Sequence, residues 1–150
     1  MGPRALAAVA ALLAVALSGC GERSVVVRDQ DGEVLAKSAL PADGSFALEY
    51  RHSYYGVAAR ERFSADGDGF RMIGVESPSE AVLDYYELAG TKRAGAWKAL
   101  VPSAPQRFKR LPLIATPVGR RTLAVDGRRY PLFGGAPRHV TIEVEESRWP

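Results

Sequence analysis

His52 and Glu61 are two ionisable residues whose spacing would place both side chains on one face of a sheet. Residues 46–52 alternate between apolar and polar, which predicts a strand with Tyr50 and His52 on one face. A two-residue turn at Tyr55 and Gly56 would return the chain and place Glu61 opposite Tyr50 and diagonal to His52. A buried histidine–carboxylate pair can be a ligand site, although it is more often a structural network. Tyr50, His52 and Glu61 are therefore candidate binding residues.

Enzyme chemistry at the same hairpin is the alternative. A hydrolase-like site would be centred on His52, Ser53 and Glu61. Neighbouring residues of a regular strand point to opposite faces, which argues against a dyad of Ser53 and His52. The sequence also lacks a Gly-x-Ser-x-Gly motif, a phosphate-binding loop, a dinucleotide fingerprint and a His-Glu-x-x-His motif. We therefore expect no catalytic residues.

The chain offers few ligands for a metal ion. His52 and His139 are its two histidines and Cys20 is its one cysteine, too few for a histidine-rich or cysteine-based centre. The segment 66–69 (Asp-Gly-Asp-Gly) has part of the spacing of a calcium loop, but Phe70 stands where a third acidic ligand belongs. Turn formation explains this segment better. We expect neither a metal nor another cofactor.

Positive charge is concentrated in residues 92–138, which contain eleven Lys and Arg residues and a single acidic residue, Asp126. Such a segment could face anionic lipid headgroups, an acidic partner or an anionic ligand. It could equally form a solvated surface beside acidic strands. The candidate binding residues in this segment are Arg120, Arg121, Arg128 and Arg129.

The N-terminus has the features of a bacterial lipoprotein signal. Arg4 precedes an apolar run from Ala5 to Leu17, which is too short to span a membrane. The run ends in Leu-Ser-Gly-Cys, which resembles the lipobox that directs lipidation of the cysteine, here Cys20. The alternatives are an ordinary signal peptide or an uncleaved helix. Gly21 follows the cysteine, where the inner-membrane retention signal of Gram-negative lipoproteins has Asp, and the resemblance to those proteins implies the outer membrane.

These features predict a division into a signal peptide, residues 1–19, and one envelope domain, residues 20–150. The chain has 150 residues, 47% hydrophobic and 25% charged, as expected of a single globular domain. We predict an all-β fold, a small antiparallel barrel or sandwich of about nine strands. The predicted strands are residues 24–28, 33–36, 46–52, 57–63, 70–75, 97–101, 122–125, 128–132 and 140–144.

Three connections carry local signals. Asp126 and Gly127 predict a tight two-residue turn of type I′. The segment 77–80 (Ser-Pro-Ser-Glu) has the pattern of a capping box with proline at the first helical position, which predicts a short helix near residues 78–88. Residues 102–117 are rich in proline and are expected to form a connection within the domain rather than a linker between domains.

The hairpin also carries a resemblance to a known family. Phe46, Tyr50, His52 and Ser53, followed by Val57, Glu61 and Phe63, resemble the Tyr-x-His-Ser and Glu-x-aromatic strands of the bacterial family called domain of unknown function 1850. The segments 77–86 and 111–116 are also similar to lipoprotein-like members. The resemblance covers about residues 24–133. It implies an accessory role beside solute-transporter permeases. No binding or catalytic residues are carried over from the family to this chain.

The sequence thus favours a non-enzymatic envelope lipoprotein that binds a partner or a small molecule. Its expected partners are the membrane, through the lipid anchor, and a transporter or other envelope protein. Its ligand is unidentified, and nucleic acid is excluded as a partner by export to the periplasmic side of the envelope.

Overall fold

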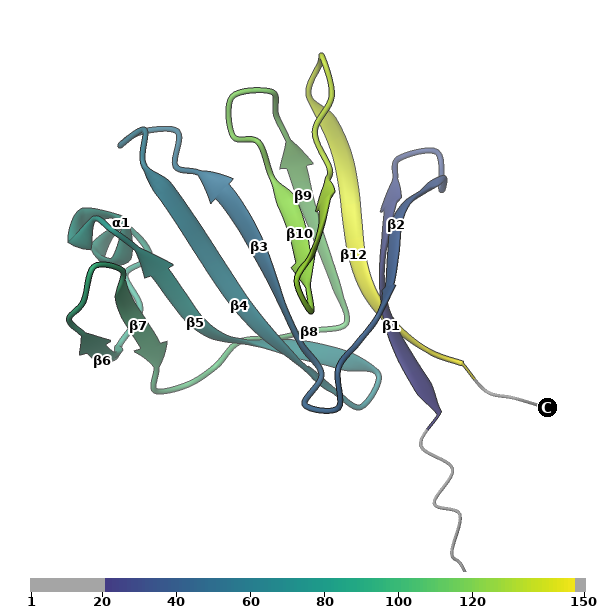
Figure 1. The fold of residues 1–150 in the computed structure, drawn as a ribbon, viewed down its shortest axis with the longest axis horizontal. Helices are drawn as coiled ribbons and strands as arrows, with labels where there is room; N and C mark the ends of the chain where they lie inside the picture. Colours follow the sequence, from purple (N-terminus) through teal and green to yellow (C-terminus); the bar gives the residue numbers. More distant parts are fainter. Residues whose placement is uncertain (1–20, 148–150) are drawn as a thin grey trace, which may run out of the picture.

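The computed structural model describes residues 21–147, which form two antiparallel sheets and one short helix. The smaller sheet contains, in order, β2 (Val34–Ala39), β1 (Glu22–Asp29), β12 (Arg138–Ser147) and β9 (Arg110–Ala115). The larger sheet contains, in order, β11 (Arg128–Pro131), β10 (Thr122–Val125), β3 (Ser45–Arg51), β4 (Ala58–Asp66), β5 (Gly69–Ser77), β7 (Lys98–Pro102) and β6 (Gly90–Arg93), and β8 (Arg107–Phe108) pairs with β5. Figure 1 shows β1, β2 and β12 on one side and β3 to β7 on the other. The all-β prediction is confirmed, and the arrangement is sandwich-like with no closed barrel among these residues.

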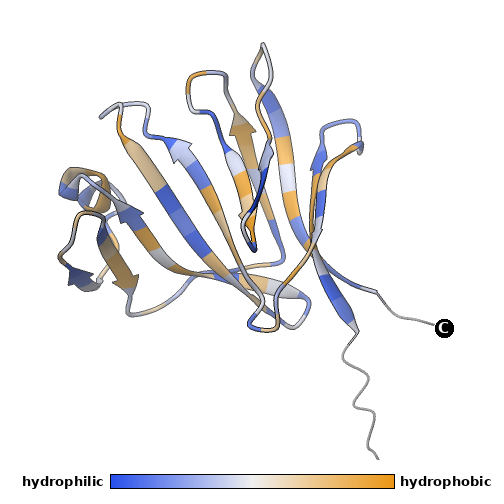
Figure 2. Ribbon diagram, viewed as in Figure 1, coloured by the Kyte–Doolittle hydropathy of each residue, from blue (hydrophilic) through white to orange (hydrophobic). Residues whose placement is uncertain are grey.

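The core lies between the two sheets, where alternate residues of strands such as β3, β4 and β12 point inward. Val25 and Val27 of β1 belong to the same buried cluster as Phe46, Phe63 and Phe70 of the larger sheet. The three phenylalanine rings lie 5.2–5.5 Å apart, in stacked and edge-on arrangements. Hydrophobic and hydrophilic residues accordingly alternate along the strands in Figure 2. The period of two predicted from the sequence thus separates a buried face from an exposed face.

All nine predicted strands are present, and three more were not predicted. The missed strands are β6, β8 and β9. Of these, β8 and β9 lie in the proline-rich segment 102–117, where a connection and no strand was predicted. Pro112 is tolerated because β9 is an edge strand that is hydrogen-bonded only to β12. The outer side of β9 has no neighbouring strand, so the N–H that proline lacks is not needed for a ladder hydrogen bond there.

The turn between β10 and β11 is as predicted. Val125 pairs with Arg128, so that two residues form the turn. Their φ angles are 46° at Asp126 and 76° at Gly127, both in the left-handed region that a type I′ turn requires.

The helix α1 (Glu80–Tyr85) is present, but the predicted capping box is wrong. Ser79, not Ser77, is the N-cap residue. Ser77 closes β5, where its hydroxyl donates to the carbonyl of Ala58 at 2.8 Å and accepts the N–H of Ser79 at 3.2 Å. The Ser77 side chain is therefore used to join the strand to the helix.

The register of β3 and β4 differs from the prediction. Tyr50 pairs with Ala59 and Leu48 with Glu61, because four residues, not two, connect His52 to Val57. The backbone of His52 donates to the carbonyl of Val57, and the N–H of Gly56 donates to the carbonyl of His52. The register shift is two residues, an even number, so each side chain keeps its predicted face.

Candidate functional site

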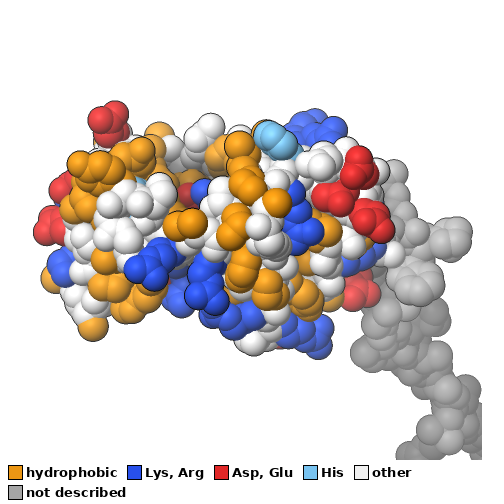
Figure 3. All heavy atoms as spheres, turned by 90° about the horizontal axis from the view of Figure 1, so that it is seen from above, with side chains coloured by type: hydrophobic (Ala, Val, Ile, Leu, Met, Phe, Trp, Pro, Cys, Tyr) orange, Lys and Arg blue, Asp and Glu red, His pale blue; other side chains and the backbone are white. Residues whose placement is uncertain are grey.

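A cavity of about 410 Å³ opens at the end of the sandwich formed by the β3–β4 and β9–β10 loops. These loops lie at the upper end of the molecule in Figure 1, and Figure 3 looks onto that end. The predicted candidates Tyr50, His52, Glu61 and Arg121 all line the cavity. The other lining residues are Arg51, Ser53, Tyr85, Tyr86, Ile114, Thr116 and Gly119.

A polar network forms one wall of the cavity. The Tyr86 hydroxyl donates to Oε1 of Glu61 at 2.6 Å and is hydrogen-bonded to the Tyr50 hydroxyl. Oε2 of Glu61 lies 3.6 Å from Nη1 of Arg121, whose guanidinium group stacks 4.7 Å above the Tyr50 ring. Glu61 and Arg121 are both largely withdrawn from solvent, with side chains 12% and 25% exposed. The network thus gives a nearly buried carboxylate a hydrogen bond and a counter-charge, as a buried charge requires.

Burial changes the acidity of both tyrosines. Burial raises the pKa of Tyr50 to about 12, although the hydrogen bond with Tyr86 partly opposes this. Burial, followed by the negative charge of Glu61, raises the pKa of Tyr86 far above its ordinary value. Both hydroxyls therefore keep their protons at neutral pH and can serve as hydrogen-bond donors.

His52 forms the rim of the cavity with exposed tyrosines. Its side chain is buried, at 5% exposure, and its ring lies 4.7 Å from Tyr85 and 5.1 Å from Tyr55. The backbone N–H of Tyr55 donates to Nδ1 of His52 at 3.4 Å. Tyr54, Tyr55 and Tyr85 remain at least 40% exposed around this ring. The rim therefore combines aromatic surface with one imidazole.

His52 and Glu61 lie on the same face of the sheet, as predicted, but the described structure shows no direct contact between them. Both side chains line one cavity, but within residues 21–147 no hydrogen bond or ion pair joins them. Glu61 is paired with Tyr86 and Arg121, and His52 is held by the β3–β4 loop. The longer loop moves His52 beyond the paired part of β3, where the diagonal contact of the predicted register is lost.

Sequence reasoning missed Tyr86 and the role of Arg121 within this network. Tyr86 follows α1, and its position in the cavity depends on how the helix packs against β5 and β7. Arg121 was considered only as part of a basic segment. The adjacent tyrosines Tyr85 and Tyr86, in a segment with a helix signal, were the available indication of an aromatic site residue.

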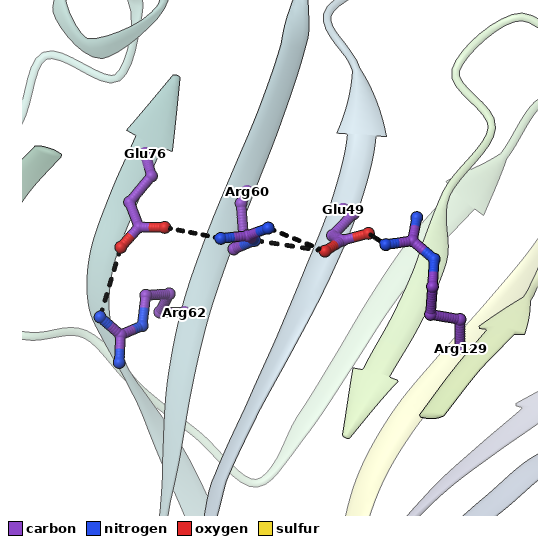
Figure 4. Close-up of polar contacts among 5 residues, drawn as sticks. All are labelled: Glu49, Arg60, Arg62, Glu76 and Arg129. Atoms are coloured by element: carbon purple, nitrogen blue, oxygen red, sulfur yellow. Dashed lines mark hydrogen bonds and ion pairs between the residues drawn. The ribbon is translucent and has the colours of Figure 1, made fainter. Parts of the chain in front are cut away.

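The remaining predicted arginines lie away from the cavity, along the outer face of the larger sheet. Arg129 of β11 contacts Glu49 of β3, which also pairs with Arg60 of β4 at 3.1 Å. Arg60 in turn contacts Glu76 of β5 at 3.1 Å, and Arg62 contacts the other oxygen of Glu76 at 3.3 Å. Figure 4 shows this continuous charge ladder across the strands. Cross-strand pairing thus uses much of the positive charge that the sequence concentrates in one segment.

Two connected hollows accompany the charge ladder. They have volumes of about 660 and 420 Å³ and share Glu49, Arg60 and Arg129 in their walls. Arg120 lines the first hollow and stacks 5.7 Å from the Phe133 ring, and Arg128 lines the second. Figure 3 shows Lys and Arg side chains gathered along this side of the molecule. The predicted binding residues are therefore divided between two faces of one sheet.

The described residues contain no group of three or more His, Cys, Asp or Glu side chains that could hold a metal ion. The acidic segment at 66–69 forms the β4–β5 turn, where Asp66 and Asp68 pair with Arg107. Within the same part of the chain, no helix has the length and hydrophobicity to cross a membrane. Cys20, the predicted lipidation residue, lies outside the described residues.

Comparison of the chain with models of protein families, with curated proteins and with solved structures finds no match. The resemblance to the family of unknown function therefore stays a prediction.

Proposed function

We propose that this chain is a lipid-anchored envelope protein that binds a small molecule in the cavity lined by His52, Glu61 and Arg121. The observation that carries the proposal is the partly enclosed cavity with a charged network on the core face of the sheet. Its volume of about 410 Å³ is in the range of small-molecule sites.

A purely structural explanation of the network is energetically less favourable. Apolar residues of the same size at Glu61 and Arg121 would avoid the desolvation of two charges, and such replacements in other proteins are often neutral or stabilising. The neighbours of Glu61 on this face follow that rule, since its cross-strand partner Leu48 and Phe63, two residues along β4, are fully buried. A charged pair beside the cavity at this end of the face supports a binding role.

The position of the anchor supports a ligand that arrives from the aqueous side. β1 begins at Glu22, two residues after Cys20, and in Figure 1 this end of β1 lies at the opposite end of the sandwich from the β3–β4 and β9–β10 loops. Acyl chains on Cys20 would hold the lower end of the sandwich near the bilayer. The cavity would then open toward the periplasm. Gly21, after the cysteine, favours the outer membrane in this proposal.

The geometry gives less support to the alternative, a hydrolase-like enzyme. A serine nucleophile must hydrogen-bond to its general base. No such bond joins Ser53 to His52 in residues 21–147, and Nδ1 of His52 instead accepts a backbone N–H. We therefore favour binding without catalysis. The family resemblance extends the proposal to an accessory role beside a solute transporter or another envelope protein.

The binding proposal is tested with one enlarged side chain in the cavity. Ile114 is a half-exposed residue of the cavity wall, so Ile114→Trp adds bulk at the cavity without replacing a core residue. Val118→Trp is the control, because Val118 is exposed and does not line it. Native mass spectrometry of protein purified from its own envelope should show a bound small molecule that only Ile114→Trp removes. A molecule retained by Ile114→Trp, or none in the unmodified protein, would contradict the proposal.

The anchor is tested separately with Cys20→Ser. The acyl chains are the strong membrane attachment in the proposal, so the variant should leave the membrane fraction for the soluble fraction. Variant protein that remains with the membranes after a high-salt wash would overturn the lipoprotein assignment.

A further inference from the structure

The Arg121 guanidinium group is held in the cavity with most of its hydrogen-bonding capacity unused. Within residues 21–147 it makes one ion pair, at 3.6 Å from Glu61, and no hydrogen bond. That distance is too long for a hydrogen bond, so Glu61 offsets the charge of Arg121 but does not accept its protons. Its central carbon lies 4.7 Å from the centre of the Tyr50 ring, a cation–π contact that helps to hold the group in place. A guanidinium group offers five N–H donors in a rigid fork that fits two oxygens of one carboxylate.

His52 supplies a second donor at the same cavity. Its Nδ1 accepts the N–H of Tyr55, so the proton of the neutral imidazole lies on Nε2. Nε2 has no hydrogen-bond partner in the described part of the chain, and no buried side-chain nitrogen or oxygen there lacks one, so this atom is accessible to solvent. An accessible N–H on a residue that lines the cavity can donate to a ligand.

The charges of the cavity disfavour a ligand with more than one negative charge. Glu61 is the one acid among the lining residues and Arg121 lies beside it, whereas the Arg51 side chain belongs to the opposite face of β3. Glu61 would repel a second negative charge on a ligand, while the unused donors of Arg121 can bind a first. Tyr85 and Ile114 offer exposed apolar surface for the body of such a ligand.

We infer that the cavity binds a small organic monocarboxylate, whose oxygens accept hydrogen bonds from Arg121 and from Nε2 of His52 while its apolar body packs against the tyrosine rim. This inference rests on the proposed function and names the ligand class of the same cavity.

The inference is tested with probes of similar shape and different charge. Phenylacetate, phenylacetamide and phenethylamine carry one aromatic body and a negative, neutral or positive head, and inorganic phosphate lacks the body. Titrations at millimolar concentration, followed by NMR of the His52 ring, should show phenylacetate binding at least about tenfold more tightly than each of the others. Equal or tighter binding of the amide, the amine or phosphate would overturn the inference, as would no binding of phenylacetate.

Two variants connect the preference to Arg121. Arg121→Lys keeps the positive charge beside Glu61 but removes the fork, so the fold is retained and phenylacetate should bind about tenfold more weakly. Arg120→Gln is the control, because Arg120 lies on the outer face and should leave binding unchanged. Equal binding to the unmodified protein and to Arg121→Lys would contradict the assigned role.

The inference and the proposed function fail differently. A co-purified molecule that Ile114→Trp removes, but which is a cation or a neutral compound, would refute the carboxylate inference and leave the binding function intact. Absence of any molecule sensitive to Ile114→Trp would refute the proposed function itself.

Discussion

Removing the Tyr86 hydroxyl tests the energetic importance of the polar network. Tyr86→Phe keeps the aromatic ring but deletes the donor that lies 2.6 Å from Glu61 and the partner of the Tyr50 hydroxyl. A hydrogen bond to a charged group contributes about 1.5–3 kcal/mol. Because the cavity admits water that can replace part of the bond, we expect the lower part of this range, a loss of about 2 kcal/mol.

The loss is measured by urea unfolding of the purified protein, followed by circular dichroism, with a parallel thermal melt. For a domain of this size about 2 kcal/mol corresponds to a lower Tm by roughly 6–8 °C. Tyr85→Phe is the matched control, since Tyr85 is 63% exposed and its hydroxyl makes no hydrogen bond among the described residues. It should change the free energy of unfolding by less than about 0.5 kcal/mol. Equal stability of the two variants would refute the reasoning.

Three further predictions concern the tyrosines, the hairpin and the charge ladder. The pKa of Tyr50 is raised to about 12, so its protonated hydroxyl contributes to stability below pH 10, and this contribution is lost as the pH rises from about 10 to 12. Tyr50→Phe has no such group to titrate. Its urea midpoint should therefore fall less over this pH interval than the midpoint of the unmodified protein. Gly127→Val places a β-branched residue at φ 76° and should lower the free energy of unfolding, measured in urea, by about 1–2 kcal/mol. Gly134→Val is the control, because a side chain at this position meets open space and should change stability little. Equal losses of stability in the two variants would contradict the turn argument. Arg128→Gln should weaken binding to anionic vesicles at low salt more than Arg129→Gln, because Glu49 already offsets Arg129, and the reverse order in a sedimentation assay would contradict this.

Local sequence patterns were sufficient for most of the fold. The nine predicted strands and the turn at Asp126 and Gly127 follow from alternation and from the φ angles that each residue type tolerates, which act over a few residues. The missed strand β9 shows the limit of such patterns. Pro112 is acceptable there only because β9 is at the edge of its sheet, and edge position is a property of the assembled sheet.

The candidate site was predictable in part. Period-two alternation placed Tyr50 and Glu61 on the buried face, and this survived the register error because the shift was an even number of residues. The contact partner of Glu61 was not predictable in the same way. Whether Glu61 contacts His52 or Tyr86 depends on the length of the β3–β4 loop and on the packing of α1.

The sequence by itself determined which side chains point inward, because the alternation of a strand is a property of its own backbone. The tertiary structure decided which inward-facing groups meet, because Glu61 on β4, Tyr86 after α1 and Arg121 before β10 are brought together only when the larger sheet has assembled. It also divided one basic segment between two faces, with Arg121 in the cavity and Arg129 on the outer charge ladder. Each of these positions depends on strand pairing between residues that are far apart in the chain. Such pairing forms cooperatively, and a local sequence pattern carries no information about it.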